Sequence, residues 1–156
     1  MEYDFVVLGA TGMQGKIVVK DLLENNYSVL LCGRDKKRIE HFLSLYKKTG
    51  FEYVDLANKK KVFKVIKHSK AKIVINCVEG DWNMNALEAC INAGVHSLDL
   101  GSDIEMTKEQ LGKDNLLKEK KLIHITGCGS VPGIGNVMLR YAAEKFDSID
   151  DIEVGF

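Results

Sequence analysis

Three glycines near the N-terminus have the spacing that a nucleotide-phosphate site requires. They lie between an apolar run, Phe5–Leu8, and a segment with helical periodicity, at positions 9, 12 and 15. In such a turn the first glycine permits a tight bend, the second lets the backbone approach a pyrophosphate, and the third lets the helix pack closely on its strand. Free amides at a helix start, with the helix dipole, favour anions. The predicted dinucleotide contacts in this turn are Gly9, Thr11, Gly12, Met13, Gln14 and Gly15.

The residues after the second predicted strand distinguish NAD from NADP. NAD sites carry an acid at this strand end, about 20 residues beyond the glycine motif, to bind the ribose 2′-hydroxyl. Here Gly33, Arg34 and Asp35 follow the strand, and residues 34–72 hold thirteen Lys or Arg against four Asp or Glu. A guanidinium suits a 2′-phosphate. We therefore predict NADP rather than NAD, although an inward-turned Asp35 would serve NAD, and the lysines alternatively form solvated helix faces.

Two further strand ends supply candidate cofactor contacts. Asp55 and Leu56 close the third predicted strand and are expected to border the adenine, unless Asp55 simply caps the next helix. Asn76, Cys77 and Val78 follow the fourth strand, at the point where the strand order is expected to reverse. Ligands lie at this point in doubly wound sheets, so these residues are predicted to line the nicotinamide ribose.

Asp99 and Cys128 are the candidate catalytic residues. Asp99 ends the fifth predicted strand and can orient a substrate or accept a proton, the alternative being a loop-capping carboxylate. Cys128, with Ser130, follows the sixth strand and is predicted to line the nicotinamide, the alternative being tight-turn packing. Gly127-Cys128-Gly129 has no adjacent histidine to act as a base, which disfavours a thiolate nucleophile. The four histidines lack ligand spacing, so no metal site is predicted.

Strand and helix patterns alternate along the chain. The predicted strands are 4–8, 28–32, 51–55, 72–77, 96–100 and 122–126. The predicted helices are 12–24, a segment that Asp35 caps, 58–69, 83–93, a polar stretch up to 121, and 134–146. Short apolar strands joined by helices are typical of a parallel sheet covered on both faces. The expected fold class is α/β: a doubly wound parallel sheet (Rossmann fold) in three α/β/α layers, with strand order 3-2-1-4-5-6.

Composition limits the partners. The 156 residues include 46% apolar and 28% charged residues with a net charge of zero, which gives no indication of a nucleic-acid partner. No apolar run approaches the roughly 20 residues of a membrane span. Four widely separated cysteines suggest reduced thiols in a cytoplasmic protein.

The chain is expected to divide near residue 150. Residues 1–150 form the NAD(P)-binding domain, and 151–156 form an apolar extended run that begins another strand. We interpret this run as the start of a truncated second domain for substrate and dimerisation.

Three stretches resemble the NADP-binding N-terminal domain of the saccharopine dehydrogenase family. These are residues 7–15 with Cys32-Gly33-Arg34-Asp35, residues 74–77 with 86–101, and residues 127–136. The resemblance implies an NADP-dependent oxidoreductase acting on the CH–NH bond of an opine-like amino acid or related amine. It also implies a second α+β domain and a homodimeric full-length protein, so the present chain alone is expected to be inactive. Glu79-Gly80-Asp81 and Val131 depart from the family pattern and argue against saccharopine itself as the substrate.

Two alternatives remain at this point. Tyr141 and Lys145 form Y-x-x-x-K eleven residues after Ser130, which resembles the catalytic pattern of short-chain dehydrogenases. A Rossmann domain can also bind NADP as a non-catalytic sensing module.

Overall fold

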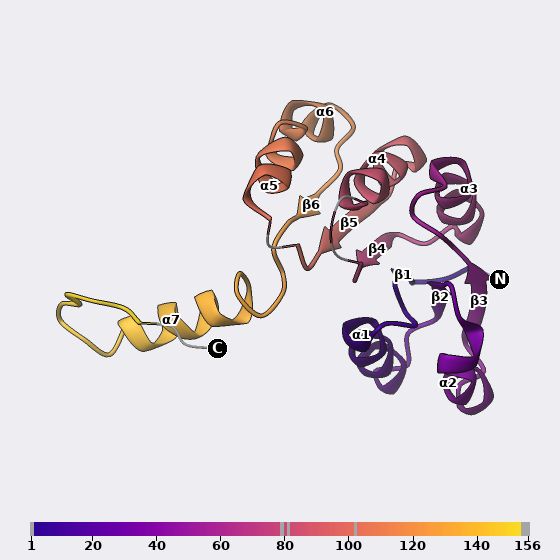
Figure 1. Cartoon of the computed structure of the whole chain (residues 1–156), viewed down its shortest axis with the longest axis horizontal. Coiled ribbons are helices and arrows are strands. Elements are labelled where there is room, and N and C mark those ends of the chain that lie inside the picture. The colour runs from indigo at the N-terminus through magenta and orange to yellow at the C-terminus, as the bar shows by residue number, and fades with distance from the viewer. Residues whose placement is uncertain (1, 79, 81, 102, 154–156) are drawn as a thin grey trace.

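The computed structural model describes residues 2–78, 80, 82–101 and 103–153. Its strands are β1 (Phe5–Leu8), β2 (Val29–Gly33), β3 (Thr49–Tyr53), β4 (Ile73–Asn76), β5 (His96–Asp99) and β6 (His124–Ile125). Its helices are α1 (Met13–Glu24), the 3-10 helix η1 (Lys36–Ile39), α2 (Glu40–Leu45), α3 (Lys59–Ser69), α4 (Asn83–Ala93), α5 (Ile104–Leu111), α6 (Asp114–Glu119) and α7 (Ile134–Ala143). Strand and helix alternate as predicted (Figure 1).

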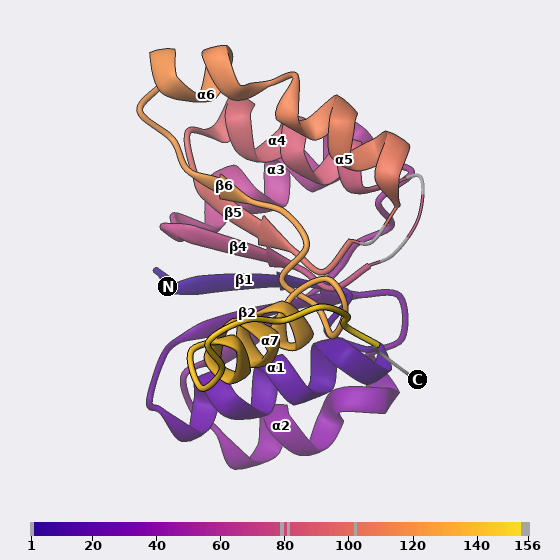
Figure 2. The ribbon, with the colours of Figure 1, turned by 90° about the vertical axis from the view of Figure 1, so that its left-hand side faces the viewer.

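The six described strands form one parallel sheet with the order β3-β2-β1-β4-β5-β6. This confirms the predicted doubly wound sheet and its strand order. Helices α3, α4, α5 and α6 lie on one side of the sheet, and α1 and α2 lie on the other (Figure 2). The order reverses between β1 and β4, whose carboxyl ends therefore meet where ligands bind in such sheets.

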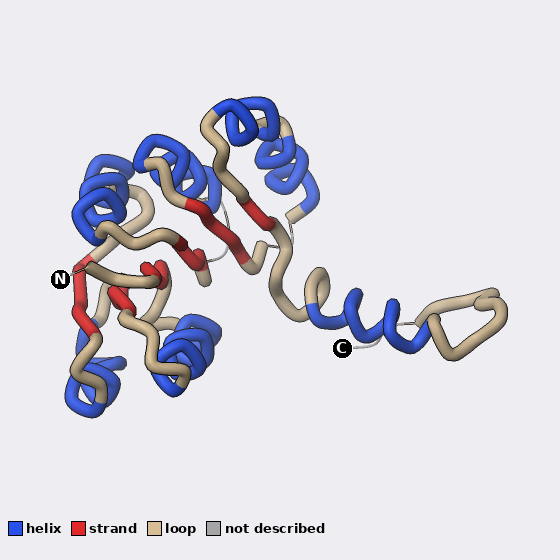
Figure 3. Tube along the Cα trace, turned by 180° about the vertical axis from the view of Figure 1, so that it is seen from behind, coloured by secondary structure: helices blue, strands red, loops and turns tan. Residues whose placement is uncertain are grey.

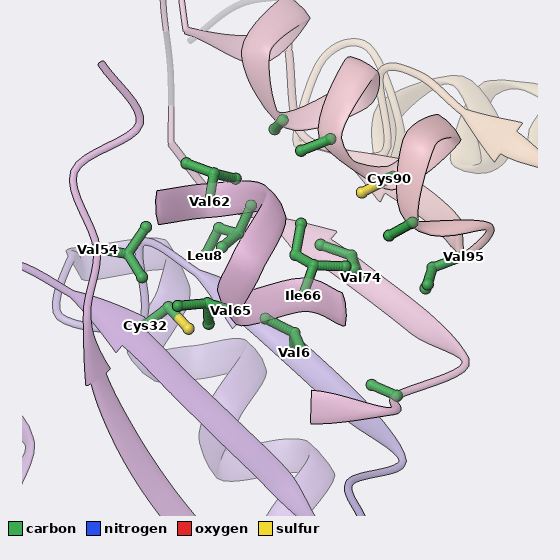
Figure 4. Close-up of a cluster of buried hydrophobic side chains, with 14 of the residues drawn as sticks. Val6, Leu8, Cys32, Val54, Val62, Val65, Ile66, Val74, Cys90 and Val95 are labelled. Atoms are coloured by element: carbon green, nitrogen blue, oxygen red, sulfur yellow. The ribbon is translucent and has the colours of Figure 1, made fainter. Parts of the chain in front are cut away.

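Strand β1 shows why the sequence runs apolar without alternation. Val6 and Leu8 belong to the core cluster beneath α3 and α4, whereas Val7 belongs to the cluster beneath α1 and α2. A strand covered on both faces buries every side chain, so neither face tolerates polar residues. Figure 4 shows the first cluster, in which Ile66 of α3 lies close to Val74 and Val6 of the strands.

Several boundaries differ from the predictions. Strand β3 begins and ends two residues earlier than expected, which leaves Asp55 and Leu56 in the following loop. Strand β6 has only two residues, because Leu122 packs toward α4 and Thr126 turns to bond with Gln110. The segment that Asp35 caps starts as a 3-10 turn before α2.

The end of the chain also departs from the prediction. Helix α7 projects beyond the β6 edge, and none of its residues is buried (Figures 1 and 3). The predicted strand over 151–156 is wrong for residues 151–153, which form no strand; residues 154–156 lie outside the described part of the chain. Because α7 carries residues 151–153 away from the sheet, none of the described strands pairs with them.

Candidate functional site

A cleft of about 490 Å3 lies over the carboxyl ends of the central strands. Its lining comes from the turns after β1, β2, β3, β4 and β5 and from the start of α4. The lining residues are Gly9, Thr11, Gly12, Met13, Gln14, Gly33, Arg34, Arg38, Val54, Asp55, Leu56, Cys77, Val78, Trp82 and Leu100. The sequence therefore brings together, in one cavity, predicted contacts that are separated by almost seventy residues.

The glycine turn has the geometry that the motif predicts. Gly9 has φ +77°, and a Cβ there would stand 2.7 Å from Cγ2 of Val78. A Cβ on Gly15 would collide with the carbonyl of Gly9, so only glycine lets α1 approach β1 this closely. Gly12 differs, because a Cβ there meets only the Gly9 oxygen, at 3.1 Å. The first and third glycines thus shape the turn, while the second keeps the cleft side of the backbone bare.

The N-terminus of α1 presents free donors to this cleft. Among the described residues, no side chain caps the helix at Gly12, and no acid occupies its first turn. The first amides of a helix lack intrahelical acceptors, and the positive end of the dipole adds to their attraction for anions. A pyrophosphate fits this end because the backbone is uncovered and the donors converge.

Positive charge borders the cleft after β2. Arg34 and Arg38 both line it, and both are exposed. Asp35 does not line it; instead, its carboxylate accepts a hydrogen bond from the backbone amide of Lys37 at 3.0 Å and caps η1. The acid that could have served NAD is therefore engaged in a local cap, which leaves two guanidinium groups for a 2′-phosphate.

The loop after β3 forms one wall of the cleft. The Asp55 carboxylate accepts a hydrogen bond from the amide of Ala57, and Asn58, rather than Asp55, caps α3 by accepting from Lys61. The side-chain amide of Asn85 on α4 donates to the carbonyl of Leu56 at 2.9 Å. This bond ties the wall to α4, so Asp55 and Leu56 lie where an adenine contact is predicted.

The loop after β4 forms the opposite region of the cleft, and Asn76 organises it. This buried side chain donates to Oδ1 of Asn83 at 2.8 Å and accepts from the Val78 amide at 3.2 Å. Cys77 and Val78 then line the cleft, while Asn76 lies behind them. Glu79 and Asp81, which depart from the family pattern, lie outside the described residues.

Asp99 lies beneath the cleft lining, with only 1% of its surface exposed. Its Oδ1 atom accepts from the amides of Gly101 and Gly127, at 2.9 and 3.2 Å, and its Oδ2 atom accepts from the side-chain amide of Gln110. Nε2 of His124 lies 3.4 Å from Oδ2 without hydrogen-bond geometry. Burial raises the pKa of Asp99, but the neighbouring imidazole and the amide donors outweigh it and hold the pKa at about 2.

These contacts give Asp99 a structural position. The carboxylate joins the loop after β5 to the loop after β6, and so holds Leu100 at the edge of the cleft. The predicted catalytic role stays a prediction, and it requires the carboxylate to become accessible.

Cys128 is the exposed member of the four cysteines, yet it does not line the cleft. Burial and the charge of Asp99 raise its pKa, which keeps the thiol protonated. Burial also raises the pKa of the cleft-lining Cys77 to about 12. Neither thiol is therefore prepared as a nucleophile. Among the described residues, no three His, Cys, Asp or Glu side chains gather as a metal site.

Sequence reasoning missed four lining residues as site members. Arg38 reaches the cleft from the 3-10 helix η1 and Trp82 from the turn before α4, whereas Val54 and Leu100 are apolar walls. The signal for Arg38 was present, since it stands four residues after Arg34 in the basic run. Trp82 had no such signal, because a single tryptophan in a loop has no spacing to read.

The short-chain dehydrogenase pattern does not form a site in this geometry. Tyr141 is on α7, 67% exposed, with the ammonium of Lys145 5.0 Å from its ring centroid. Tyr141, Lys145 and Ser130 do not line the described cleft. A catalytic tyrosine must reach the reacting atoms, so the geometry gives this alternative no support.

The comparisons with known proteins agree with the site. The family model described as the saccharopine dehydrogenase NADP-binding domain matches residues 5–122. The chain belongs to this family. The predicted family and the predicted cofactor, NADP, are therefore confirmed, and the domain is part of a dehydrogenase-like enzyme family.

Individual proteins that resemble this saccharopine dehydrogenase NADP-binding domain are related to it only distantly in sequence. Carboxynorspermidine synthase from Vibrio alginolyticus is 32% identical over 101 residues, which cover 58% of this chain and 24% of that protein. The apo saccharopine dehydrogenase of Saccharomyces cerevisiae superposes with a TM-score of 0.74 at 13% identity, over 92% of this chain and 31% of that one. A short-chain dehydrogenase/reductase from Veillonella parvula in complex with NADP superposes with a TM-score of 0.59 at 16% identity. The superposition covers 80% of this chain and 68% of that one. The structural likenesses show the fold alone. The chain spans about a quarter of the length of the curated relative that it matches.

No helix in the described part of the chain combines the length and apolar character needed to cross a bilayer.

Proposed function

We propose that this domain holds NADP(H) for an oxidoreductase that acts on the CH–NH bond of an opine-like amino acid or a related amine. The observation that carries the proposal is the cleft itself, where an uncapped helix N-terminus and two arginines border one cavity. Bound NADP(H) supplies or accepts the hydride in such chemistry. The relative's printed name, a carboxynorspermidine synthase, supports an amine-forming reaction.

The residues of this chain would bind and orient the cofactor. The bare backbone at Gly12 and the amides after it would grip the diphosphate, and Arg34 with Arg38 would grip the 2′-phosphate. Asp55 and Leu56 would border the adenine, and Cys77 and Val78 the nicotinamide ribose.

The chemistry step needs more than this cleft supplies. Asp55 is the carboxylate among the described lining residues, and it accepts a hydrogen bond from the amide of Ala57, so we propose that a substrate-binding segment supplies the group that moves the proton. We therefore retain the proposal that residues 151–156 begin a second, substrate-binding and dimerising domain, and that residues 1–156 alone bind cofactor without turnover.

Binding is tested by titration with NADPH and NADH. Trp82 is the single tryptophan of the chain and lines the cleft, so its fluorescence reports on the bound nucleotide directly. Quenching should saturate with both nucleotides, with NADPH binding at least tenfold more tightly, and isothermal calorimetry should show the same order. The absence of both heat and quenching with either nucleotide would overturn the proposal.

The enzymatic part is tested on the full-length gene product. NADPH oxidation is measured with a carbonyl compound together with an amino acid or a diamine. Turnover only when both are present supports reductive formation of a CH–NH bond. Tight NADPH binding without turnover over a panel of such pairs would favour the sensing module instead.

A further inference from the structure

The single tryptophan of the chain lies in the wall of the cleft and not in the core. Trp82 lines the cleft just before α4, and 44% of its surface is exposed. None of the aromatic pairs among the described residues includes it. A tryptophan ring offers a large apolar surface and stacks on other flat rings. An indole left open in a ligand cleft is therefore available to a ring of the ligand.

The backbone at Trp82 already follows the helix. Its φ and ψ are −89° and −7°, and its carbonyl accepts a hydrogen bond from the amide of Ala86 at 3.2 Å. The positions that share its helix face are therefore Asn85, Ala86 and Ala89, three, four and seven residues further on. The side-chain amide of Asn85 donates to the carbonyl of Leu56, and the two alanines belong to the core cluster that contains Leu56. The face of α4 that carries Trp82 thus turns toward the loop after β3.

Two hydrogen bonds fix the start of α4. Asn83, the residue after Trp82, accepts a hydrogen bond from the side-chain amide of Asn76, and both asparagines are buried. Asn85 holds the same turn to the carbonyl of Leu56 at 2.9 Å. Helical side chains point back toward the start of their helix, so the indole points toward the carboxyl ends of the strands, where the cleft lies. Because the backbone is fixed before a ligand arrives, the ring loses little freedom when the ligand binds.

Positive charge and apolar lining meet on the same side of the cleft. Val54 and Leu56 line the cleft, and each is 5% exposed. The Val54 amide donates to the carbonyl of Gly33 at 3.1 Å, and Arg34 follows Gly33 directly. The proposed 2′-phosphate site therefore borders the loop after β3, toward which Trp82 also faces.

The chemistry of the cofactor decides which of its rings lies here. The 2′-phosphate of NADP(H) is carried by the ribose that also carries the adenine, whereas the diphosphate and a second ribose separate it from the nicotinamide. The ring beside Arg34 and the loop after β3 is therefore the adenine. Aromatic side chains stack on purines without the need for a specific hydrogen-bond pattern.

We propose that the indole of Trp82 stacks on the adenine of bound NADP(H), and that Val54 and Leu56 form the apolar wall beside the base. Trp82 then fixes the adenosine half of the cofactor, while the glycine turn holds the diphosphate. This inference rests on the part of the proposed function in which the cleft holds NADP(H), and it is independent of the reaction.

Stacking makes Trp82 a residue for affinity and not for selectivity between the two nucleotides. NADPH and NADH carry the same adenine and differ in the 2′-phosphate alone. Trp82→Ala should therefore weaken the binding of both by the same factor, roughly 5- to 100-fold, which is the usual effect of removing a stacked aromatic ring. Arg34→Ala, in contrast, should act mainly on NADPH.

The first test divides the cofactor into its two halves. Adenosine 2′,5′-bisphosphate carries the adenine and the 2′-phosphate, and nicotinamide mononucleotide carries the other ring. Adenine does not absorb where tryptophan emits, so a change in Trp82 fluorescence with the bisphosphate reports contact rather than energy transfer. The bisphosphate should bind in calorimetry and change the Trp82 emission to saturation, whereas the mononucleotide should leave the emission unchanged. N-acetyltryptophanamide corrects for collisional quenching.

The outcomes of this test separate the inference from the proposed function. Binding of the bisphosphate without a change in emission, or a change with the mononucleotide alone, would overturn the stacking of Trp82 and leave the binding of NADP(H) intact. A parent chain that binds no NADPH would overturn the proposed function and this inference together.

The second test measures the dissociation constants of NADPH and NADH in Trp82→Ala and Trp82→Phe by calorimetry. Phenylalanine keeps a ring, so Trp82→Phe should recover most of the affinity that Trp82→Ala loses. Tyr53→Ala is the matched control, because Tyr53 is a 56% exposed aromatic residue at the end of β3 that does not line the described cleft. It should leave both constants within about twofold of the parent.

Three results of the second test would overturn the inference. They are parental affinity in Trp82→Ala, a loss confined to NADPH, and the absence of any recovery in Trp82→Phe. The urea midpoints of the variants should stay near that of the parent, because Trp82 is exposed, and they show that affinity rather than folding has changed.

Discussion

A methyl group added at each glycine of the phosphate turn meets a different obstacle. At Gly15 it would collide with the carbonyl of Gly9 and come within 2.9 Å of the Ala10 Cα atom. At Gly12 it meets only the Gly9 oxygen, at 3.1 Å, and otherwise enters the cleft. A substitution at Gly15 should therefore affect folding, whereas a substitution at Gly12 should affect cofactor binding.

The variants Gly12→Ala and Gly15→Ala should behave differently. We expect Gly12→Ala to lose NADPH affinity by tenfold or more while its urea midpoint stays near that of the parent, because the methyl blocks the phosphate side only. Gly15→Ala should lose stability by roughly 1–3 kcal/mol, the usual cost of overpacking, because α1 must move off β1. Chemical denaturation and calorimetry on both variants check this. Equal losses of stability in the two variants would contradict it.

We expect Arg34 to determine the preference for NADP, because its side chain lines the cleft. Arg34→Ala should weaken NADPH binding by roughly 10- to 100-fold, since a hydrogen bond to a charged group contributes about 1.5–3 kcal/mol, and should leave NADH binding within a few-fold. Lys37→Ala is the matched control, because Lys37 belongs to the same basic run but does not line the cleft. Equal losses for both nucleotides would refute the assignment.

Residue types predicted only part of this site. The glycines, Arg34 and the strand-end residues follow from spacing, because a strand end fixes where the next side chain goes. Trp82 and Arg38 depend on how a turn and a 3-10 helix start, and no periodic pattern encodes that. Gly15, Asp35 and Asn76 were predicted as contacts but do not line the cleft; Gly15 and Asn76 are buried beside it, and Asp35 caps η1.

At the scale of elements, one carboxylate connects three of them. Asp99 at the end of β5 holds Gln110 of α5 and the loop after β6. These hydrogen bonds correspond to the loop-capping role that the sequence analysis gave as the alternative for Asp99. The partners could not be predicted from the sequence, because Gln110 and Gly127 are distant from Asp99 along the chain.

Asp99→Asn should therefore be destabilising in a pH-dependent manner. A folded-state pKa of about 2, against an ordinary 3.8, corresponds to about 2.5 kcal/mol of stability that is present above pH 4 and is lost as the pH falls from 4 to 2. Urea unfolding at pH 7 should show a deficit of roughly this size in the variant, and the deficit should shrink toward pH 2. Asp147→Asn, at an exposed position, is the control. A loss of stability that stays constant between pH 7 and pH 2 would show that the ionisation of Asp99 does not contribute to the stability of the fold.

Element boundaries were predicted less well than element types. Buried strands such as β1 and β4 are bounded by turns on both sides, so their apolar runs end where the strands end. Strand β6 was overestimated because Leu122 and Thr126 fit a strand pattern, yet Leu122 packs against α4 and α6 and Thr126 bonds to Gln110. Apolarity alone does not distinguish a strand residue from a loop residue that packs against a helix.

For the whole molecule, binding of the cofactor should appear as stability. NADPH at 100 times its dissociation constant adds about 2.7 kcal/mol to the free energy of unfolding. For a domain of this size this corresponds to a rise in Tm of roughly 5–10 °C. NADH at the same concentration should raise the Tm less than NADPH does, and NADPH should raise the Tm of Gly12→Ala less than that of the parent. Scanning fluorimetry measures both shifts; an unchanged Tm with saturating NADPH would show that the folded domain does not bind it.

The whole-molecule architecture was the most predictable feature. Alternating strands and helices require right-handed crossovers in a parallel sheet, and the glycine turn after the first strand places that strand in the centre. The direction of α7 was not predictable, because it depends on backbone hydrogen bonds in the loop between residues 127 and 135.

The central place of β1 has a consequence during synthesis. The ribosome makes the phosphate-binding turn first, yet β1 pairs on one side with β4, and the wall beside Gly9 is Val78. Until Val78 has left the exit tunnel, halfway through the 156 residues, the nascent chain lacks half of the nucleotide's enclosure. Cellular NADP can therefore assist the maturation of this domain only after Val78 has emerged.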